Sequence, residues 1–339
     1  MKPEVIDVHS HHYPRWYIDL LKARTEIPRV IGDPGDERFV IFPGEAEQTG
    51  GRPISPDYWD LDAKFEFMAA AGIDRALLSL GNPWLDPLDA ETGLEAARRS
   101  NAYFAELGER TGGRVVGMGV LPPGDVRHAV TVVGEIASTA SLHGIISGTR
   151  ICGRRLDDPD LEPLWEVLER TRVPLLVHPH YGIGGEELAG FGHALPVAVG
   201  FPFETTLAVT RLVFAGVLHR HPLLRVVASH GGGTLPYLAG RLDAGWRSDP
   251  SVHGRLPEAP SDSLKRLFLD AVLYHPRALR AAADLVGVDR LAFGTDHPFS
   301  VADPARNLTA IREAFDADGA ERVLAGAALA LFDLEASQE

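Results

Sequence analysis

Short apolar runs alternate with longer amphipathic stretches along almost the whole chain. The first run is Val5-Ile6-Asp7-Val8, and further β-rich runs follow at residues 75–80, 114–120, 143–147, 173–178, 224–230, 266–271 and 291–296. Helical patterns lie between and after these runs, at residues 60–71, 90–110, 126–138, 163–172, 204–220, 275–286, 304–315 and 320–332. Eight strands with intervening helices predict an α/β fold of the (β/α)8 TIM barrel type.

One segment interrupts this alternation. Residues 14–56 separate the first strand from the first clear barrel helix, and they are rich in Gly, Pro and charged residues. A connection of this length inside a compact domain is usually functional or has a small structure of its own. We therefore expect a single domain over residues 1–339, in which residues 14–56 form a lid-like insertion over the barrel mouth, with short strands around residues 38–42.

Composition narrows the class of protein. The chain has 339 residues, of which 45% are hydrophobic, and a formal net charge of -14, so it can bury a large core and is a poor partner for nucleic acid or an anionic membrane. Cys152 is the only cysteine, which excludes an intrachain disulfide and a cysteine-based zinc site. The start of the chain lacks a long apolar stretch, and no run approaches the ~18 apolar residues of a membrane span. We expect a cytoplasmic enzyme.

Histidines stand where the predicted strands end. His9 and His11 close the first strand, and side chains two residues apart in a strand point to the same side. His178, His230 and Asp296 end three later strands, and in a barrel these ends meet at the face that carries the active site. Imidazole and carboxylate are preferred ligands of zinc and related divalent ions. The pattern predicts a metal site made of His9, His11, His178 and Asp296.

Two of these residues have more than one possible role. Asp296 is compatible with a metal ligand, a general base or the N-terminal cap of a helix. His230 precedes Gly231-Gly232-Gly233, which lets backbone or substrate approach closely, and we favour an acid/base role for it over a ligand role. His180 and His297 lie near the site as candidate pocket residues. The remaining histidines are expected to be structural or solvated: His12, His128, His143, His193, His219, His221, His253 and His275.

The distribution of lysines indicates one metal ion. Many barrel metalloenzymes hold two metals with a carboxylated lysine at the end of the fourth strand, but residues 143–150 contain no lysine. The four lysines of the chain are not expected at any strand exit: Lys2, Lys22, Lys64 and Lys265.

Several motifs carry a family resemblance. They include Ile6-Asp7-Val8-His9-Ser10-His11, Gly117-Met118-Gly119-Val120-Leu121-Pro122, Val177-His178-Pro179, Pro202-Phe203-Glu204-Thr205-Thr206, Ser229-His230-Gly231-Gly232-Gly233, Gly240-Arg241-Leu242 and Gly294-Thr295-Asp296-His297-Pro298-Phe299. With them the chain resembles the amidohydrolase superfamily, and within it the decarboxylase group typified by 2-amino-3-carboxymuconate-6-semialdehyde decarboxylase.

The resemblance implies roles for individual residues. His9, His11, His178 and Asp296 would bind one divalent metal, with Zn²⁺ favoured and Mn²⁺ as the alternative, and His230 would be the catalytic acid/base. Arg52 would hold a substrate carboxylate, and Arg241 would reach into the neighbouring site of a homodimer. The chain departs from the group at His180, where the group has Trp, and at His297, where it has Tyr; these departures leave the substrate open.

The favoured function is metal-dependent, non-oxidative decarboxylation of a small unsaturated or aromatic carboxylic acid, in which Asp296 and His230 serve the chemistry. The first alternative is a metal-dependent hydrolase or hydratase of a small acidic substrate on the same scaffold. The second is a non-catalytic metal-binding or scaffold protein, which the number of acid/base groups at strand exits disfavours.

Overall fold

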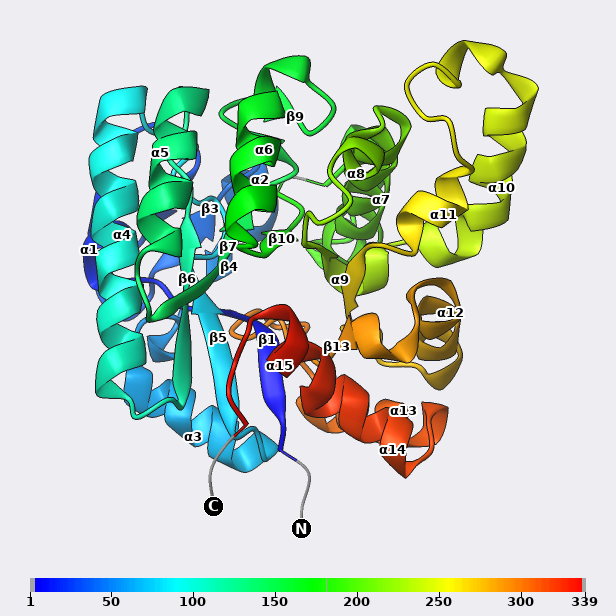
Figure 1. Ribbon diagram of the computed structural model, residues 1–339. Coiled ribbons are helices and arrows are strands. Elements are labelled where there is room, and N and C mark those ends of the chain that lie inside the picture. The colour runs from blue at the N-terminus through cyan, green and yellow to red at the C-terminus, as the bar shows by residue number, and fades with distance from the viewer. Residues whose placement is uncertain (1–3, 181, 337–339) are drawn as a thin grey trace.

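A closed sheet of parallel strands forms the centre of the molecule, and the computed structural model describes residues 4–180 and 182–336 of the chain (Figure 1). The eight strands follow one another around the sheet in the order β1 (Ile6–His11), β5 (Arg75–Ser79), β6 (Val115–Val120), β7 (Leu142–Ser147), β10 (Leu175–Val177), β11 (Val226–Ala228), β12 (Phe268–Asp270) and β13 (Leu291–Ala292). Hydrogen bonds from Val8 N to Phe293 O (2.9 Å) and from Asp296 N to His9 O (2.8 Å) join the last strand to the first. The predicted (β/α)8 barrel is confirmed.

The barrel strands are buried on both faces, as their continuous apolar runs predict. Every residue of β1 and β6 is buried. The strands are shorter than the sequence pattern indicated, because β10 ends at Val177 and β11 ends at Ala228. His178 and His230 therefore lie just beyond the strands, in the loops at the carboxyl ends, where side chains can turn towards the barrel axis.

Helices cover the outside of the sheet (Figure 1). Those with bounds within one or two residues of the prediction are α3 (Leu61–Ala71), α4 (Ala90–Arg110), α5 (Val126–Ala137), α6 (Glu162–Thr171), α12 (Pro276–Val286) and α13 (Pro304–Ala314). Aspartate side chains cap several of them; Asp60, for example, accepts from Asp62 N at the start of α3. The smaller elements are α9 (Ser229–Gly232), α11 (Pro260–Leu264), and the hairpin of β8 (Arg150–Ile151) and β9 (Arg154–Arg155).

Two helical predictions differ from the structure, and one long helix was not predicted. The stretch at 204–220 is two helices, α7 (Phe201–Phe214) and α8 (Val217–Arg220), because Gly216 between them has φ 72° and ends the first helix. The tail at 320–332 is divided into α14 (Ala317–Glu321), a π-helical turn (Arg322–Gly326) and α15 (Ala327–Leu331). The sequence analysis missed α10 (Leu235–Ser248) altogether. Its apolar side chains do follow a helical spacing, with Leu235 buried and Ala239, Leu242 and Trp246 partly buried against the core, so the pattern was present and was overlooked.

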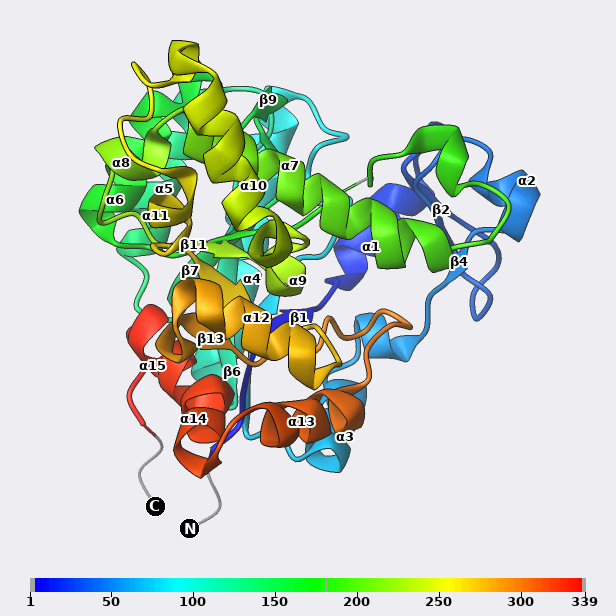
Figure 2. The ribbon, with the colours of Figure 1, turned by 90° about the vertical axis from the view of Figure 1, so that its right-hand side faces the viewer.

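The segment after β1 has a structure of its own. It contains α1 (Arg15–Lys22), α2 (Glu45–Thr49) and a three-stranded antiparallel sheet of β2 (Arg29–Ile31), β3 (Arg38–Val40) and β4 (Arg52–Pro53). Strand β3 lies where short strands were predicted. In Figure 2 this segment projects from the barrel beside the N-terminal part of the long α7 ribbon. Tyr13, Phe39 and Tyr58 pack their rings together within 6 Å and join the segment to the barrel.

The helical stretch Pro196–Phe214 has the length and mean hydropathy, 1.4, of a membrane-crossing segment, and 44% of it is buried inside the protein. Its buried Glu204 accepts hydrogen bonds from Thr149 Oγ1, His180 N (3.1 Å) and Gly182 N (2.5 Å). A carboxylate that organises neighbouring barrel loops identifies this stretch as a helix of the barrel wall.

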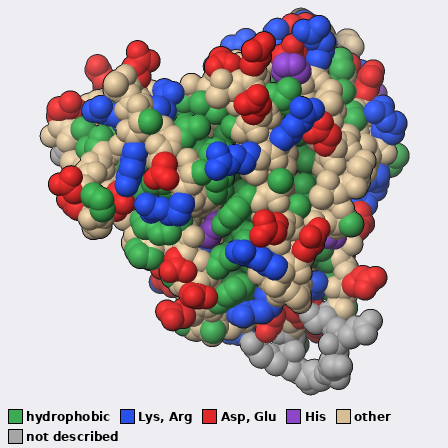
Figure 3. Space-filling view, turned by 90° about the vertical axis from the view of Figure 1, so that its left-hand side faces the viewer, with side chains coloured by type: hydrophobic (Ala, Val, Ile, Leu, Met, Phe, Trp, Pro, Cys, Tyr) green, Lys and Arg blue, Asp and Glu red, His purple; other side chains and the backbone are tan. Residues whose placement is uncertain are grey.

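On the face shown in Figure 3, basic and acidic side chains are interspersed among apolar ones. The net charge of -14 is therefore not collected into one acidic patch on that face.

Candidate metal centre

Four side chains from three separate parts of the chain meet at the carboxyl ends of the strands. One nitrogen each of His9, His11 and His178 and one oxygen of Asp296 all lie within 4.8 Å of one another, and all four residues are buried. Asp296 Oδ1 lies 3.2 Å from His9 Nε2, 3.3 Å from His11 Nε2 and 3.6 Å from His178 Nε2. The structure thus brings together the four residues expected to bind a metal.

The other ring nitrogen of each histidine is held by a neighbour. His9 Nδ1 lies 2.6 Å from Asp270 Oδ2, and His11 Nδ1 lies 3.1 Å from Ser79 Oγ. His178 Nδ1 lies 2.6 Å from Pro179 O. These contacts fix the orientation of the rings, so that each Nε2 faces the common centre.

The buried nitrogens at this centre suit a cation. Within the described residues, Nε2 of His9 and Nε2 of His178 make no hydrogen bond of normal geometry although both atoms are buried. Three imidazoles set nearly perpendicular to one another, at 88–89°, and one carboxylate oxygen form a donor set for a divalent ion. A divalent ion at this point would satisfy nitrogens that otherwise have no partner, so the residues fit the metal.

Burial and neighbouring charges shift the pKa values of all four residues. Burial lowers the pKa of His11 to about 3 and that of His178 to about 4, so both rings are neutral at neutral pH. Burial also disfavours charge on His9, but the carboxylates of Asp296 and Asp270 outweigh it and raise the pKa of His9 to about 10. Burial alone would raise the pKa of Asp296; the charge of His9 and hydrogen bonds from the other histidines instead hold that pKa well below its usual range. Asp296 is a carboxylate.

His230 lies beside the cluster but is more open to solvent. Its Nε2 is 3.4 Å from Asp296 Oδ2, and its side chain is 12% exposed, compared with 0–1% for the three other histidines. Its backbone is left-handed, with φ 54° and ψ 47°. The three glycines that follow also have positive φ, and Gly233 leaves no room for a side chain, since a Cβ there would lie 2.1 Å from Pro202 O. His230 is therefore placed to touch a substrate as well as Asp296.

The cap alternative for Asp296 is wrong. The next helix, α13, is capped by Asp303, whose Oδ1 accepts from Arg306 N at 3.0 Å. Asp296 has φ 63°, and its backbone is fixed by the hydrogen bond from its N–H to His9 O. The carboxylate is thus free to point at the histidines.

The sequence analysis did not predict that three buried charged residues support the cluster from behind. Asp270 on β12 holds His9, and Asp7 on β1 accepts from His9 N (3.0 Å) and Thr295 Oγ1 (2.6 Å). Lys64 lies on α3, but its Nζ reaches the exit of β1, contrary to the expectation that no lysine is found at a strand exit. Asp7 offered a signal, because a charged residue in an apolar strand implies a buried partner; the contact of Lys64 is visible only in three dimensions.

Arg52 does not lie in the metal cluster. It belongs to β4 of the insertion, where its Nε donates to Glu45 Oε1 at 2.9 Å and its buried Nη2 has no hydrogen-bond partner among the described residues. The rings of Tyr58 and Phe299 lie 6.1 Å apart, and those of Phe299 and His11 lie 5.1 Å apart. This row of aromatic rings connects the insertion to the metal ligands.

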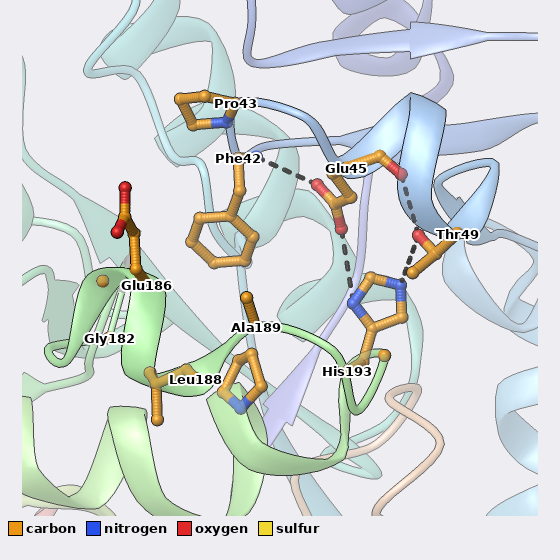
Figure 4. Close-up of a pocket in the computed structure, with 12 residues that line it drawn as sticks. Phe42, Pro43, Glu45, Thr49, Gly182, Glu186, Leu188, Ala189 and His193 are labelled. Atoms are coloured by element: carbon orange, nitrogen blue, oxygen red, sulfur yellow. Dashed lines mark hydrogen bonds and ion pairs between the residues drawn. The ribbon is translucent and has the colours of Figure 1, made fainter.

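A cavity of about 430 Å³ opens between the insertion and the loop that precedes α7 (Figure 4). Figure 4 shows Phe42, Glu45 and Thr49 on one wall and Leu188 and His193 on the other. His193, expected to be structural or solvated, lies 3.4 Å from Glu45 Oε1 and 3.3 Å from Thr49 Oγ1. Burial and the nearby Arg52 lower the pKa of His193. The polar end of this cavity therefore contains the residues that surround Arg52.

The three other predicted pocket residues have different surroundings. His180 is buried with Nδ1 2.9 Å from Asp86 Oδ2, and its ring lies 4.8 Å from that of Trp84, which in turn lies 5.6 Å from that of His178. The ring of His297 stacks on Phe67 of α3 and contacts Lys64, so it is held by the layer behind the ligands. Arg241 is exposed on α10.

The chain is similar to known proteins in both sequence and structure. A sequence profile described as Amidohydrolase matches residues 6–334. The 2-amino-3-carboxymuconate-6-semialdehyde decarboxylase of Dictyostelium discoideum is 29% identical over 291 residues, which is 84% of this chain and 79% of that protein. The crystal structure of Metarhizium anisopliae IDCase in apo form is 34% identical, with a TM-score of 0.92 over 98% of this chain and 97% of the other.

A third relative was solved with a metal. It is the 5-carboxyvanillate decarboxylase of Novosphingobium aromaticivorans, complexed with manganese and 4-hydroxy-3-methoxy-5-nitrobenzoic acid. It is 25% identical to this chain, with a TM-score of 0.82, and the match covers 98% of this chain and 97% of the other.

Proposed function

The chain belongs to the amidohydrolase family, and from that premise we propose that it is a metal-dependent, non-oxidative decarboxylase of a small aromatic or unsaturated carboxylic acid. The observation that carries the proposal is the meeting of three imidazoles and Asp296 at one buried centre, with His230 beside it on the open side. Relatives named as decarboxylases, one of them complexed with manganese and a nitrobenzoic acid, support the reaction class.

His9, His11, His178 and Asp296 would hold one divalent ion. Such an ion, when bound, polarises the substrate and makes a bound water more acidic. Three imidazole nitrogens and one carboxylate oxygen suit Zn²⁺, which is our first choice, with Mn²⁺ as the alternative. The neutral state of His11 and His178 leaves their Nε2 lone pairs available without the removal of a proton.

His230 would move the proton. Its Nε2 is held near Asp296 Oδ2, and from this position it can deliver a proton to the substrate carbon that bears the carboxylate. The bond from that carbon to the carboxylate carbon then breaks, its electron pair returns to the unsaturated system, and carbon dioxide leaves. The substrate has gained one proton and lost one carbon dioxide, so no oxidant or reductant is needed.

Arg52 would bind the substrate carboxylate from the side of the insertion. Glu45 holds the guanidinium through Nε, which leaves the buried Nη2 available to an anionic oxygen. Because the insertion contributes Arg52 and one wall of the cavity, we propose that it acts as a lid over the site. His180, next to Trp84 and His178, would border the same pocket.

We further propose that the working unit is a homodimer to which Arg241 contributes in trans. Helix α7 contacts the start of α10, where Thr206 Oγ1 and Thr234 Oγ1 are 3.0 Å apart. The two helices expose Phe203 (43%), Leu207 (49%) and Tyr237 (89%), large apolar side chains that a second copy would cover. Arg241 lies one helical turn from Tyr237 on α10, so it would be carried into the same interface. A cytoplasmic location accords with the single cysteine of the chain.

The decisive experiment is to incubate the metal-loaded enzyme with a panel of aromatic and unsaturated acids labelled with ¹³C at the carboxyl group. The proposal expects labelled carbon dioxide and a product that gains one solvent hydrogen at the carbon that lost the carboxyl group. The hydrolase or hydratase alternative expects added water and no labelled carbon dioxide. The variant His178→Ala, which lacks one ligand, should lose both the metal on dialysis and the reaction; full metal occupancy in this variant would contradict the ligand assignment.

A further inference from the structure

The most unusual buried group outside the metal cluster is the ammonium of Lys64. Its side chain is fully buried, and its Nζ donates to Ser10 Oγ at 2.9 Å, to His11 O at 3.0 Å and to His297 Nδ1 at 2.5 Å. An ammonium has three N–H donors, so all of them are used. Each acceptor belongs to a metal ligand or to a residue next to one in the sequence.

These contacts join α3 to two neighbouring segments of the barrel. Ser10 and His11 belong to β1, which carries two of the histidine ligands, and His297 follows Asp296 after β13. The same two segments are connected by hydrogen bonds from His11 N to His297 O (2.7 Å) and from Ser10 Oγ to His297 O (3.3 Å). Phe67, three residues after Lys64 on α3, stacks on the ring of His297 at 3.7 Å. The helix therefore fixes β1 and the Asp296 segment against each other.

A buried ammonium is costly unless it is fully paired. Here the three acceptors and the charge of Asp7 offset that cost, while burial still lowers the pKa of Lys64. A methionine of similar length would fill the same space without any such cost. Packing of the core therefore does not explain why a lysine stands at this position. Its hydrogen bonds to the two segments that carry the proposed ligands do explain it.

We infer that Lys64 is a positioning residue for the metal site: it sets the distance between His11 on β1 and Asp296 after β13, and thereby the affinity and geometry of the bound ion. This inference rests on the metal site of the proposed function. Residues that hold metal ligands from outside typically change metal affinity by about 10- to 100-fold when they are removed.

The test compares Lys64→Met with the wild type and with the control Lys265→Met, which removes an exposed lysine paired with Asp262. Metal-free protein is titrated with Co²⁺ in competition with a chelator, and the visible absorption of bound Co²⁺ is recorded. We expect Lys64→Met to bind Co²⁺ about tenfold or more weakly with a changed spectrum, and Lys265→Met to match the wild type. Wild-type affinity and spectrum in folded Lys64→Met would overturn the inference. Failure of the wild type to bind Co²⁺ would instead overturn the metal site itself.

Two further variants test the positioning role of Lys64 even if Lys64→Met does not fold. Ser10→Ala and His297→Phe each remove one acceptor of Lys64, and phenylalanine keeps a ring for stacking on Phe67. Both should weaken Co²⁺ binding in the same direction without a matching loss in thermal midpoint. In the double variant Lys64→Met/Ser10→Ala, the loss should be no greater than in Lys64→Met alone, because the serine acts through the lysine. Additive losses, or wild-type binding in both single variants, would contradict the assignment.

Discussion

His9 Nδ1 donates to Asp270 Oδ2 over 2.6 Å, and both side chains are fully buried. The contact links β1 to β12, the two strands on either side of β13 in the closed sheet. The other oxygen of Asp270 accepts from Gly231 N at 2.9 Å and from Val272 N at 3.1 Å. Asp270 thus connects His9, a proposed metal ligand, to the segment that carries His230. One carboxylate orients both the proposed metal site and the proposed acid/base.

Replacement of that carboxylate tests the connection. Asp270→Asn keeps the volume but removes the charge, and we expect about 10- to 100-fold weaker metal binding, measured by chelator competition. Turnover at saturating metal should also fall, because the amide offers its oxygen to only one of the two donors, His9 Nδ1 or Gly231 N. Asp289→Asn, an exposed aspartate 3.5 Å from Arg322, is the matched control and should behave as the wild type. Unchanged metal affinity in Asp270→Asn would show that His9 is oriented by other means.

Metal binding should release a proton from His9. In the metal-free protein the pKa of His9 is raised from 6.5 to about 10, so the stability that its charged form contributes is fully present below 6.5 and is lost as the pH rises through about 10. A metal at Nε2 requires the neutral ring, whereas His11 and His178 have no proton to lose at neutral pH. Between 6.5 and 10, affinity should therefore rise about tenfold per pH unit.

Titration calorimetry in buffers with different ionisation enthalpies measures this proton directly. We expect about one proton released per ion near neutral pH, and fewer in Asp270→Asn, where the carboxylate that helps to raise the pKa of His9 is absent. An enthalpy that is the same in every buffer would contradict the protonated state of His9.

The convergence of the metal ligands was accessible from the sequence because it follows from two local rules. Alternation along β1 places His9 and His11 on one side, and strand ends of a barrel meet at one face. The contacts of Asp270 and Lys64 were not accessible. Asp270 ends β12 but belongs to no recognisable motif, and Lys64 lies on a helix; their partners are 261 and more than 50 positions away in the chain.

The sequence pattern also did not predict several helix boundaries and short elements of the fold. The long helix expected before residue 220 is interrupted at Gly216, since a left-handed glycine ends α7, while the apolar pattern continues beyond it. Helix α10, which carries Arg241, was overlooked although Leu235, Leu242 and Trp246 recur at helical spacing, because most of its other residues are polar or exposed. The pairing of Arg52 with Glu45 is local, across the Gly50-Gly51 connection between α2 and β4, but the sequence pattern predicted neither of these two short elements.

His230→Ala should separate metal binding from catalysis. The variant keeps all four ligand residues, so we expect wild-type metal content by elemental analysis, whereas turnover should fall by about 10²- to 10⁴-fold with the loss of the proton donor. His219→Ala, which removes a half-exposed histidine near Glu258, is the control. Near-normal turnover in His230→Ala would exclude this residue from the mechanism.

Arg52→Met should weaken substrate binding more than it slows the reaction. The guanidinium is expected to hold the carboxylate in the ground state, so its loss should raise KM about tenfold or more, with a smaller change in kcat and none in metal content. Arg38→Met removes a neighbouring arginine from β3, whose partner is the exposed Asp36, and should leave KM unchanged. If Arg52→Met kept the wild-type KM, the substrate carboxylate would be bound by a residue other than Arg52.

The dimer proposal predicts that two inactive variants regain activity when their subunits are mixed, which a monomeric enzyme would not do. Suppose that Arg241 acts in the partner's site. Arg241→Ala and His230→Ala are then each inactive alone, but after subunit exchange a mixed dimer combines an intact His230 with an intact Arg241 in one of its two sites. Random exchange should restore about a quarter of wild-type activity. Leu207→Glu, which puts a charge on the exposed face of α7, should give a monomer by light scattering and abolish the recovery. Activity of the mixture equal to the sum of the separate variants would show that Arg241 acts within its own chain or not at all.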